Sequence, residues 1–317
     1  MQIIRHIGEQ DFAGSVVTLG NFDGIHLGHQ TLIAGAVSDC KKLALPSVVL
    51  TFEPHPVSVL APDRAPKLIL AHKDKMRLLQ GFGVDIVAVQ HFDLSFAKLS
   101  AEEFVRDLLV RRLKARKIWA GKDLRFGQGR RGGVDDLRRW SNEFGFEVAV
   151  VEPILVDGSR VSSSRIREFL SDGRVDEVKA MLGRYHFVSG RVVEGHRRGK
   201  DLGFPTANLA PRTEVLPADG IYATLLHLGD RVLPSVSSIG LNPTFGAGPR
   251  TVESFIMAFD ENIYGEAVQL SFVKRIRDEI KFSSVPDLIA QIRDDVRDAE
   301  AVLHGVRIDK IASSSQP

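Results

Sequence analysis

The segment 20–29, GNFDGIHLGH, holds two histidines whose spacing suits chemistry on a phosphate. His26 and His29 are three residues apart, close to one helical turn, so both rings can face one site. Two imidazoles beside the free N–H groups of a helix start would stabilise a charged transition state. Gly28 would let a nucleotide approach the backbone. The alternative is a glycine-rich turn with two solvated histidines, and the position after an apolar strand favours the site.

A second polar segment, VSSSRIR at 161–167, places three hydroxyls before the helical pattern Ile166, Phe169 and Leu170. Such a run can simply cap a helix. As a binding site, its hydroxyls, the free N–H groups and Arg167 would hold a phosphate. The residues alone leave both interpretations open.

The first half of the chain alternates apolar strands with helical patterns. The predicted strands are 15–19, 47–51, 85–89, 117–120 and 146–151, and the predicted helices are 28–43, 73–81, a helix capped by Ser100 and Glu103, and 135–144. This alternation predicts an α/β fold with a parallel sheet covered on both faces. Ligands bind such sheets at the carboxyl ends of the strands, which is where the segment 20–29 lies.

After Gly183 the pattern changes to short strands separated by glycine and proline, which predicts an antiparallel β-barrel or sandwich. Pro286 then opens a long helix, whose predicted buried stripe is Leu288, Ile289, Ile292, Val296 and Leu303. We therefore expect one domain over residues 1–183, a second over 184–310, and a frayed tail over 311–317. Because the motifs separate at this boundary, we expect two sites that act independently.

Composition limits the class of protein. The chain has 317 residues, a net charge of +2 and one cysteine, Cys40. The near-neutral charge gives no case for binding nucleic acid or a membrane surface. One thiol forms no internal disulfide and no cysteine-based zinc site, which fits a reducing compartment. No signal peptide or membrane span is evident, so we expect a cytoplasmic protein; the sequence sets no oligomeric state.

The motifs of the first half resemble a known superfamily. The strand, GNFDGIHLGH and helix, followed by VSSSRIR, resemble the nucleotidyltransferases with HxGH and ISSTxxR motifs. The segments TFEPHP at 51–56 and GKDLRFG at 121–127 resemble the adenylyltransferase half of bacterial bifunctional FAD synthetases.

The second half resembles the riboflavin kinase module of the same enzymes. LGFPTANL at 202–209 is similar to its PTAN motif, and IGLNPTFG at 239–246 and TVESF at 251–255 are similar to its later motifs. The resemblance covers nearly the whole chain, in order. It implies a Rossmann-like nucleotidyltransferase domain followed by an antiparallel β-barrel kinase domain with a terminal helix.

The resemblance implies a two-step synthesis of flavin cofactors. The C-terminal module would transfer the γ-phosphate of ATP to riboflavin, giving FMN. The N-terminal module would transfer AMP from a second ATP to FMN, giving FAD and pyrophosphate. Both steps would need Mg²⁺.

In the kinase module, the resemblance makes Thr206 and Asn208 the oxygen ligands of Mg²⁺, which prefers such ligands together with phosphates and water. Glu253 would take the proton of the attacking ribityl hydroxyl. Gly203 and Pro205 would shape the phosphate-binding turn. Taken without the resemblance, Glu253 reads as an outward strand carboxylate and the other residues as turn residues.

In the adenylyltransferase module, the resemblance implies no covalent intermediate: the FMN phosphate would attack the α-phosphate of ATP directly. His26, His29 and Arg167 would stabilise the phosphates. The other predicted nucleotide- and phosphate-binding residues are Gly20, Asn21, Phe22, Asp23, Gly28, Ser162, Ser163, Ser164 and Asp123. His55, between two prolines, is left out of the catalytic set because a lone histidine there is more often structural.

The sequence departs from the family pattern at a few positions. The family usually has an acidic or small polar residue at Lys122, Phe at Leu124, Asp at His196 and Thr at Ser164. Lys122 and Leu124 would alter packing around the flavin or nucleotide, and His196 would alter the phosphate loop of the kinase. The segment 127–132, GQGRRG, matches GxGxxG but lies late in the domain, so it reads as a mobile basic loop rather than a dinucleotide fingerprint.

Two rival functions remain to be weighed. One is a nucleotidyltransferase whose second domain only binds a ligand. The presence of all three predicted kinase residues, Thr206, Asn208 and Glu253, argues against it. The other is a non-catalytic protein that senses a flavin or nucleotide. That protein would be expected to have lost His26, His29 or Glu253, and it has lost none of them.

Overall fold

The computed structural model describes the chain apart from residues 6, 9, 196–198, 200–201, 241–249 and 307–317. The chain forms two compact units, which we call the N-terminal and C-terminal units. The first comprises Met1–Lys67 and His72–Ser162, and the second comprises Leu68–Ala71 and the chain from Ser163 onward. These units are defined by contacts within the structure. The boundary between the two enzyme domains near Gly183 stays a prediction from the sequence.

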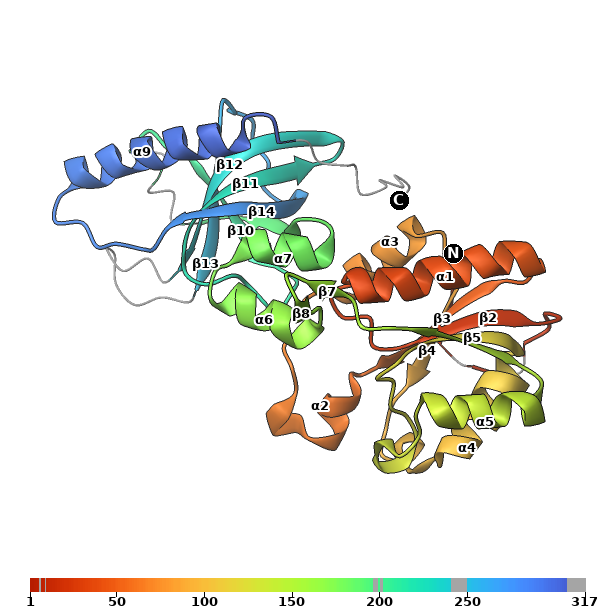
Figure 1. Cartoon of the computed structure of the whole chain (residues 1–317). Coiled ribbons are helices and arrows are strands. Elements are labelled where there is room, and N and C mark those ends of the chain that lie inside the picture. The colour runs from red at the N-terminus through yellow and green to blue at the C-terminus, as the bar shows by residue number, and fades with distance from the viewer. Residues whose placement is uncertain (6, 9, 196–198, 200–201, 241–249, 307–317) are drawn as a thin grey trace. The chain divides into compact units, whose positions relative to one another are not determined.

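The N-terminal unit is built on a six-stranded parallel sheet, in the order β1-β4-β3-β2-β5-β6. Its strands are β1 (Gln2–Ile4), β2 (Ser15–Leu19), β3 (Ser47–Glu53), β4 (Ile86–His91), β5 (Ala115–Gly121) and β6 (Glu147–Val151). A small hairpin joins β7 (Leu155–Val156) to β8 (Ser159–Arg160). The central strands β2, β3 and β4 are largely buried because helices cover both faces of the sheet, with α1 on one face and α4 and α5 on the other (Figure 1).

The helices of this unit follow the predicted alternation. They are α1 (Leu27–Leu43), α2 (Pro56–Leu60), η1 (Pro62–Arg64), α3 (His72–Gly81), η2 (Phe96–Lys98), α4 (Ala101–Glu103), η3 (Phe104–Arg112), η4 (Gln128–Arg130) and α5 (Val134–Phe144). The capping box of Ser100 and Glu103 is present, but the helix it opens continues as the π-helix η3, which residue spacing did not predict. The short edge strand β1 was also missed.

The C-terminal unit is a closed antiparallel barrel of six strands, in the order β10-β13-β12-β11-β14-β9. The strands are β9 (His186–Val193), β10 (Thr206–Pro211), β11 (Gly220–Leu228), β12 (Arg231–Gly240), β13 (Thr251–Ile256) and β14 (Ala267–Arg277). The helices are α6 (Ser163–Ser171), α7 (Val175–Leu182) and α9 (Val285–Leu303), of which α9 lies across β11, β12 and β14 (Figure 1). Closure decides between the predicted barrel and sandwich in favour of the barrel.

Helix α9 begins at Val285, as Pro286 predicted, and its predicted stripe is confirmed in part. Leu303 is buried, and Leu288, Ile289, Ile292 and Val296 are half-buried. Asp295 and Ala299 are also buried, which the apolar spacing did not predict. Asp295 accepts two hydrogen bonds from Arg277 of β14, at 2.7 and 2.6 Å. The apolar spacing therefore located the helix, while a buried ion pair sets how it docks on the barrel.

Among the described residues, the structure contains no helix with the length and apolar character that crossing a membrane requires.

Candidate active sites

The carboxyl ends of three neighbouring strands carry the polar segments of the N-terminal unit. Gly20 follows β2, Glu53 ends β3 and Gly121 ends β5. The chain passes from β2 outward to β3 and β4, and then returns to the other side of β2 to form β5 and β6. The strand order reverses at β2, and a reversal of this kind opens a crevice for ligands at the carboxyl edge.

The loop that leaves β2 has an unusual backbone. Phe22, Gly24 and Ile25 have φ values of 50°, 84° and 40°, all in the left-handed region. Only glycine adopts this region without strain, and a β-branched residue such as Ile25 is rare there. Both Phe22 and Ile25 are fully buried, so packing holds the strained turn in place. Strained loops of this kind gather at functional sites. The residue types alone did not predict this conformation.

The two histidines form a stacked pair at the start of α1. His26 is the N-cap, and its Nδ1 accepts a hydrogen bond from the backbone N–H of His29 at 3.4 Å. The two ring centroids lie 3.7 Å apart with an angle of 16° between the planes. A Cβ at Gly28 would come within 3.2 Å of the His26 ring. Gly28 therefore leaves room for the His26 ring, and its approach to a nucleotide stays a prediction.

Burial and charge keep the second histidine neutral. The pKa of His29 lies well below its usual 6.5, because the ring is buried and because His26 and Lys75 add positive charge nearby. Its Nδ1 is buried and has no hydrogen-bond partner among the described residues. Buried polar atoms are normally paired, so an orphaned ring nitrogen beside a strained loop marks a functional site.

Asn21 is held by a histidine that sequence reasoning left out of the site. Nδ1 of His55 accepts a hydrogen bond from the backbone N–H of Val57 at 3.2 Å, which fixes the ring. Its Nε2 lies 2.9 Å from Nδ2 of Asn21, so the ring in turn holds the Asn21 side chain.

Lys75 of α3 also reaches this loop, although sequence analysis did not select it. Its Nζ donates to the backbone oxygen of Asn21 at 3.3 Å and to Oγ1 of Thr51 at 3.4 Å. Burial lowers the pKa of Lys75, and the carboxylates of Asp23 and Glu53 oppose that shift. Asp23 is itself buried. A lone lysine in an amphipathic helix gives no sequence signal for such a role.

The polar residues after β5 are engaged with neighbours on the surface. Asp123 forms an ion pair with Arg160 at 2.7 Å, and Lys122 forms one with Glu152 at 2.9 Å. Leu124 packs against the hydrophobic core of the unit. The departures at Lys122 and Leu124 are thus accommodated by an exposed ion pair and by apolar packing.

The GQGRRG segment forms a hydrogen-bonded turn. Phe126 and Gly132 exchange two backbone hydrogen bonds, of 3.1 and 2.9 Å, and Gln128 N–H donates to the oxygen of Leu99 at 2.7 Å. Gly127 has a φ of 71° and packs against the backbone of Ala101, where no Cβ would fit. Its glycines therefore serve a tight turn between β5 and α5 rather than a dinucleotide fingerprint, and its mobility stays a prediction.

The division between the two units falls within the VSSSRIR segment of the sequence. Ser162 ends the N-terminal unit, and Ser163 and Ser164 form the first turn of α6 in the C-terminal unit. Arg167 follows one turn later and is half-buried. The predicted helical pattern is confirmed, since Ile166, Phe169 and Leu170 are its buried residues. Phosphate binding by the hydroxyls and Arg167 stays a prediction.

In the C-terminal unit, strand pairing brings the predicted kinase residues together. Asn208 of β10 stands directly opposite Glu253 of β13. Oγ1 of Thr206, two residues earlier and on the same face, donates to Oε2 of Glu253 at 3.3 Å. The backbone of Gly195 lies against the Asn208 amide, leaving no space for a Cβ.

The donor set of this cluster fits a magnesium ion. It offers a hydroxyl, an amide oxygen and one carboxylate, all hard oxygen donors on adjacent ladder positions. Mg²⁺ commonly takes one or two protein ligands and completes its shell with phosphates and water. Among the described residues, no cluster of three or more His, Cys, Asp or Glu side chains offers an all-protein metal cage.

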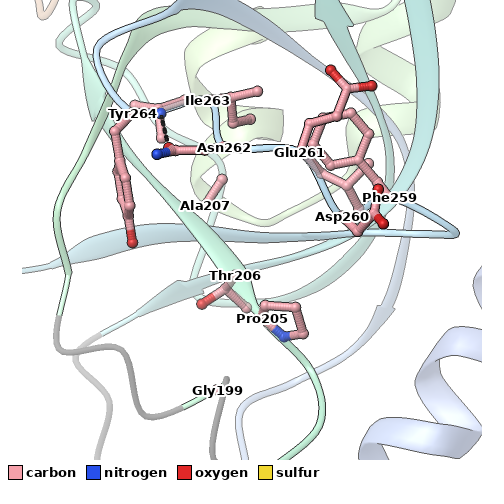
Figure 2. Close-up of a pocket in the computed structure, with 12 residues that line it drawn as sticks. Gly199, Pro205, Thr206, Ala207, Phe259, Asp260, Glu261, Asn262, Ile263 and Tyr264 are labelled. Atoms are coloured by element: carbon pink, nitrogen blue, oxygen red, sulfur yellow. Dashed lines mark hydrogen bonds between the residues drawn. The ribbon is translucent and has the colours of Figure 1, made fainter.

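A cavity of about 560 Å³ adjoins the cluster, and the sequence did not reveal it. Figure 2 shows Pro205, Thr206 and Ala207 on one wall, with Phe259 and Tyr264 among the residues of the segment that closes it. The walls combine apolar and aromatic side chains with the polar groups of Asp260, Glu261 and Asn262. A ring system with a polar edge suits such a lining.

The turn before β10 needs a glycine, while phosphate binding by Gly203 and Pro205 stays a prediction. Gly203 has a φ of 83°, which glycine tolerates, and the backbone N–H of Phe204 donates to the oxygen of Gly199 at 2.8 Å. The departure at His196 and the part of the IGLNPTFG motif from Leu241 to Gly246 lie outside the described residues.

The fold and the two clusters together define a two-site enzyme, with a nucleotidyltransferase-like unit and a barrel unit. A family model described as FAD synthetase matches residues 8–165, and one described as riboflavin kinase matches residues 182–303. The chain belongs to the family of bifunctional riboflavin kinase/FMN adenylyltransferases. This confirms the resemblance seen in the motifs.

Relatives match almost the whole chain. The bifunctional riboflavin kinase/FMN adenylyltransferase of Escherichia coli K12 is 38% identical over 293 residues, covering 92% of this chain and 94% of the relative. The enzyme of the same name from Bacillus subtilis is 34% identical, covering 93% and 94%. A crystal structure titled as a macrolide-efflux protein from Streptococcus pneumoniae has a TM-score of 0.84 and 34% identity, covering 97% of this chain and all of that chain.

Proposed function

We propose that this chain makes FAD from riboflavin in two ATP-dependent steps, one in each predicted domain. The domain predicted over residues 184–310 phosphorylates riboflavin to FMN, and the domain predicted over residues 1–183, which includes the segment 161–167, joins AMP to FMN. The observation that carries the proposal is that the two family models match in succession and that each matched stretch holds its own polar cluster. The predicted order of the two activities is confirmed by the order of the models.

In the kinase step, an oxygen of the ribityl hydroxyl forms a bond to the γ-phosphorus of ATP, and the bond to the β,γ-bridging oxygen breaks to release ADP. Glu253 accepts the hydroxyl proton. Thr206 holds that carboxylate by its own hydrogen bond while its oxygen lone pairs stay available to a cation. Thr206 and Asn208 would hold Mg²⁺, and that ion would supply positive charge to the phosphates. The adjoining cavity takes the ring system of one substrate.

In the adenylyltransferase step, a phosphate oxygen of FMN attacks the α-phosphorus of ATP and pyrophosphate leaves. No proton transfer is needed, so catalysis rests on positioning and charge stabilisation. Neutral His29 donates a hydrogen bond to a phosphate oxygen, and His26, Asn21 and Arg167 supply further donors. Ser162, Ser163 and Ser164 hold phosphate from the second polar segment, and Asp123 lies on the flavin or nucleotide side.

The proposal also includes the metal ion and the cellular compartment. Both steps use Mg²⁺, supported by the oxygen donors around Glu253 and by the phosphate chemistry of both reactions. The enzyme works in the cytoplasm, supported by its dependence on ATP and by a single, buried cysteine.

The test is a chromatographic time course of the full chain with riboflavin, ATP and Mg²⁺. FMN should appear first and FAD later, and a chelator should stop both. FMN without FAD would leave only the kinase. No phosphorylated flavin at all would overturn the proposal in favour of a binding protein.

A further inference from the structure

We propose that Lys75 is a positioning residue for the adenylyltransferase reaction: its ammonium clamps the strained loop 20–25 to the end of β3 and thereby sets where His26 and His29 stand. The inference rests on the proposed function of this unit. It adds a residue from a separate helix to a site otherwise formed by the strand ends and the loop.

Lys75 contacts the loop and β3 at the same time. Its Nζ donates both to the backbone oxygen of Asn21, at 3.3 Å, and to Oγ1 of Thr51, at 3.4 Å. Oγ1 of Thr51 also donates to the Asn21 oxygen at 3.4 Å. One loop carbonyl is therefore held by two donors, which come from α3 and from the end of β3.

The backbone of the loop explains why it needs this support. Phe22 and Ile25 occupy the left-handed region, where a residue with a side chain persists only if its surroundings hold it. Asn21 is the residue immediately before the first of these strained positions. At the far end, the Gln30 side chain donates to the Ile25 oxygen at 2.9 Å. Lys75 and Gln30 thus hold opposite ends of the strained turn.

The charges around Lys75 fit a structural cation rather than a free surface one. The carboxylates of Asp23 and Glu53 lie close enough to raise the pKa of Lys75 against the effect of burial, and Glu53 is also paired with Arg5 at 2.8 Å. The positive charge of Lys75 also contributes to the low pKa of His29. Lys75 therefore holds the loop and favours the neutral imidazole that donates to phosphate.

The test compares Lys75→Met, which keeps the length of the stem and removes the charge, with Lys75→Arg and with Lys73→Met. Lys73 is exposed on the same helix, so its variant controls for a change of charge on α3. FAD formation from FMN and ATP is measured over a range of both substrates. Riboflavin kinase activity of the same sample reports that the chain is folded.

We expect Lys75→Met to lower kcat for FAD formation by about 10- to 100-fold, as a misplaced catalytic group would. The KM values should change far less, because the histidines act in the transition state. Lys75→Arg should recover part of the loss, and Lys73→Met should behave like the wild type. Amide hydrogen exchange over residues 20–29 should speed up in Lys75→Met only.

An unchanged kcat in Lys75→Met would overturn the inference. So would a rise in the KM for ATP at constant kcat, which would indicate direct contact with ATP instead. A loss of FAD formation that merely follows a lower melting temperature would reduce Lys75 to a stability residue. If the wild type itself formed no FAD, the proposed function would fail, and the hydrogen-exchange comparison would still show whether Lys75 holds the loop.

Discussion

The two candidate sites of this chain are held together by different means. In the N-terminal unit, His26 and His29 depend on a strained loop that is clamped by His55, Lys75 and Gln30. In the C-terminal unit, Asn208 and Glu253 are neighbours in a β-ladder, and the strand hydrogen bonds position them. A ladder needs few supporting side chains, whereas a strained loop needs several, so the first site is the more sensitive to changes outside it.

The sharpest way to separate the two sites is Glu253→Gln. This variant keeps the shape of the side chain and its hydrogen bond from Thr206, but it removes the base. We expect the riboflavin kinase turnover to fall by about 10²- to 10⁴-fold. FAD formation from supplied FMN should stay at the wild-type rate, as measured in the same preparation. A parallel loss of both activities would show that the sites are not independent.

The matching change in the first site is His29→Leu. Loss of one preorganised donor should lower the turnover of FMN adenylylation by about 10²- to 10³-fold. Kinase activity on riboflavin provides the control. Near-normal FAD formation in this variant would mean that the orphaned Nδ1 of His29 has no catalytic partner.

The stability of the C-terminal unit depends on a buried ion pair outside its candidate site. Asp295→Ala would leave Arg277 of the barrel without its partner, and we expect a loss of about 3 kcal/mol in the free energy of unfolding of the C-terminal unit. Asp294→Ala is the control, because its pair with Arg297 is exposed and should contribute less than about 1 kcal/mol. Urea unfolding measures both. Equal effects would show that α9 does not dock through Asp295.

Acid should also weaken the C-terminal unit through His186. Burial, with the charge of Arg184 nearby, lowers the pKa of His186 to about 3. The unfolded chain then binds the proton more readily, so this contribution to stability is complete above pH 6.5 and is lost as the pH falls towards 3. At pH 5 we expect a loss of about 2 kcal/mol.

Thermal unfolding at pH 7.5 and pH 5 measures that loss. His186→Leu should show a smaller difference between the two pH values than the wild type does. His304→Leu, an exposed histidine just after α9, should keep the wild-type difference. A wild-type pH dependence that survives in His186→Leu would rule out this histidine as its source.

The smallest effect is expected at Lys122, which departs from the family pattern. Its ion pair with Glu152 is exposed on both sides, so Lys122→Ala should change the unfolding free energy by less than about 1 kcal/mol. The KM for FMN should be unchanged. A clear rise in that KM would place Lys122 against the flavin and make this loop part of the first site.

Many helices and strands were predictable because residues within a single short segment determine them. The apolar strand 15–19 is β2 itself, and the helices predicted at 28–43 and 135–144 are α1 and α5, each starting one residue earlier. Strand and helix propensity and capping act within a few residues, so a single segment reveals them. The π-helix η3 was missed because its spacing of apolar residues resembles that of an α-helix.

By itself the sequence determined the two motif sets, their order and the kinds of domain that carry them, since those depend on residue type and local spacing. Only the tertiary structure decided that Lys75 and His55 reach Asn21, that Asn208 faces Glu253, and that Asp295 is buried. Each of these depends on strand register or helix docking between segments distant in the chain. Such contacts are set by the packing of the whole unit, which no single segment encodes.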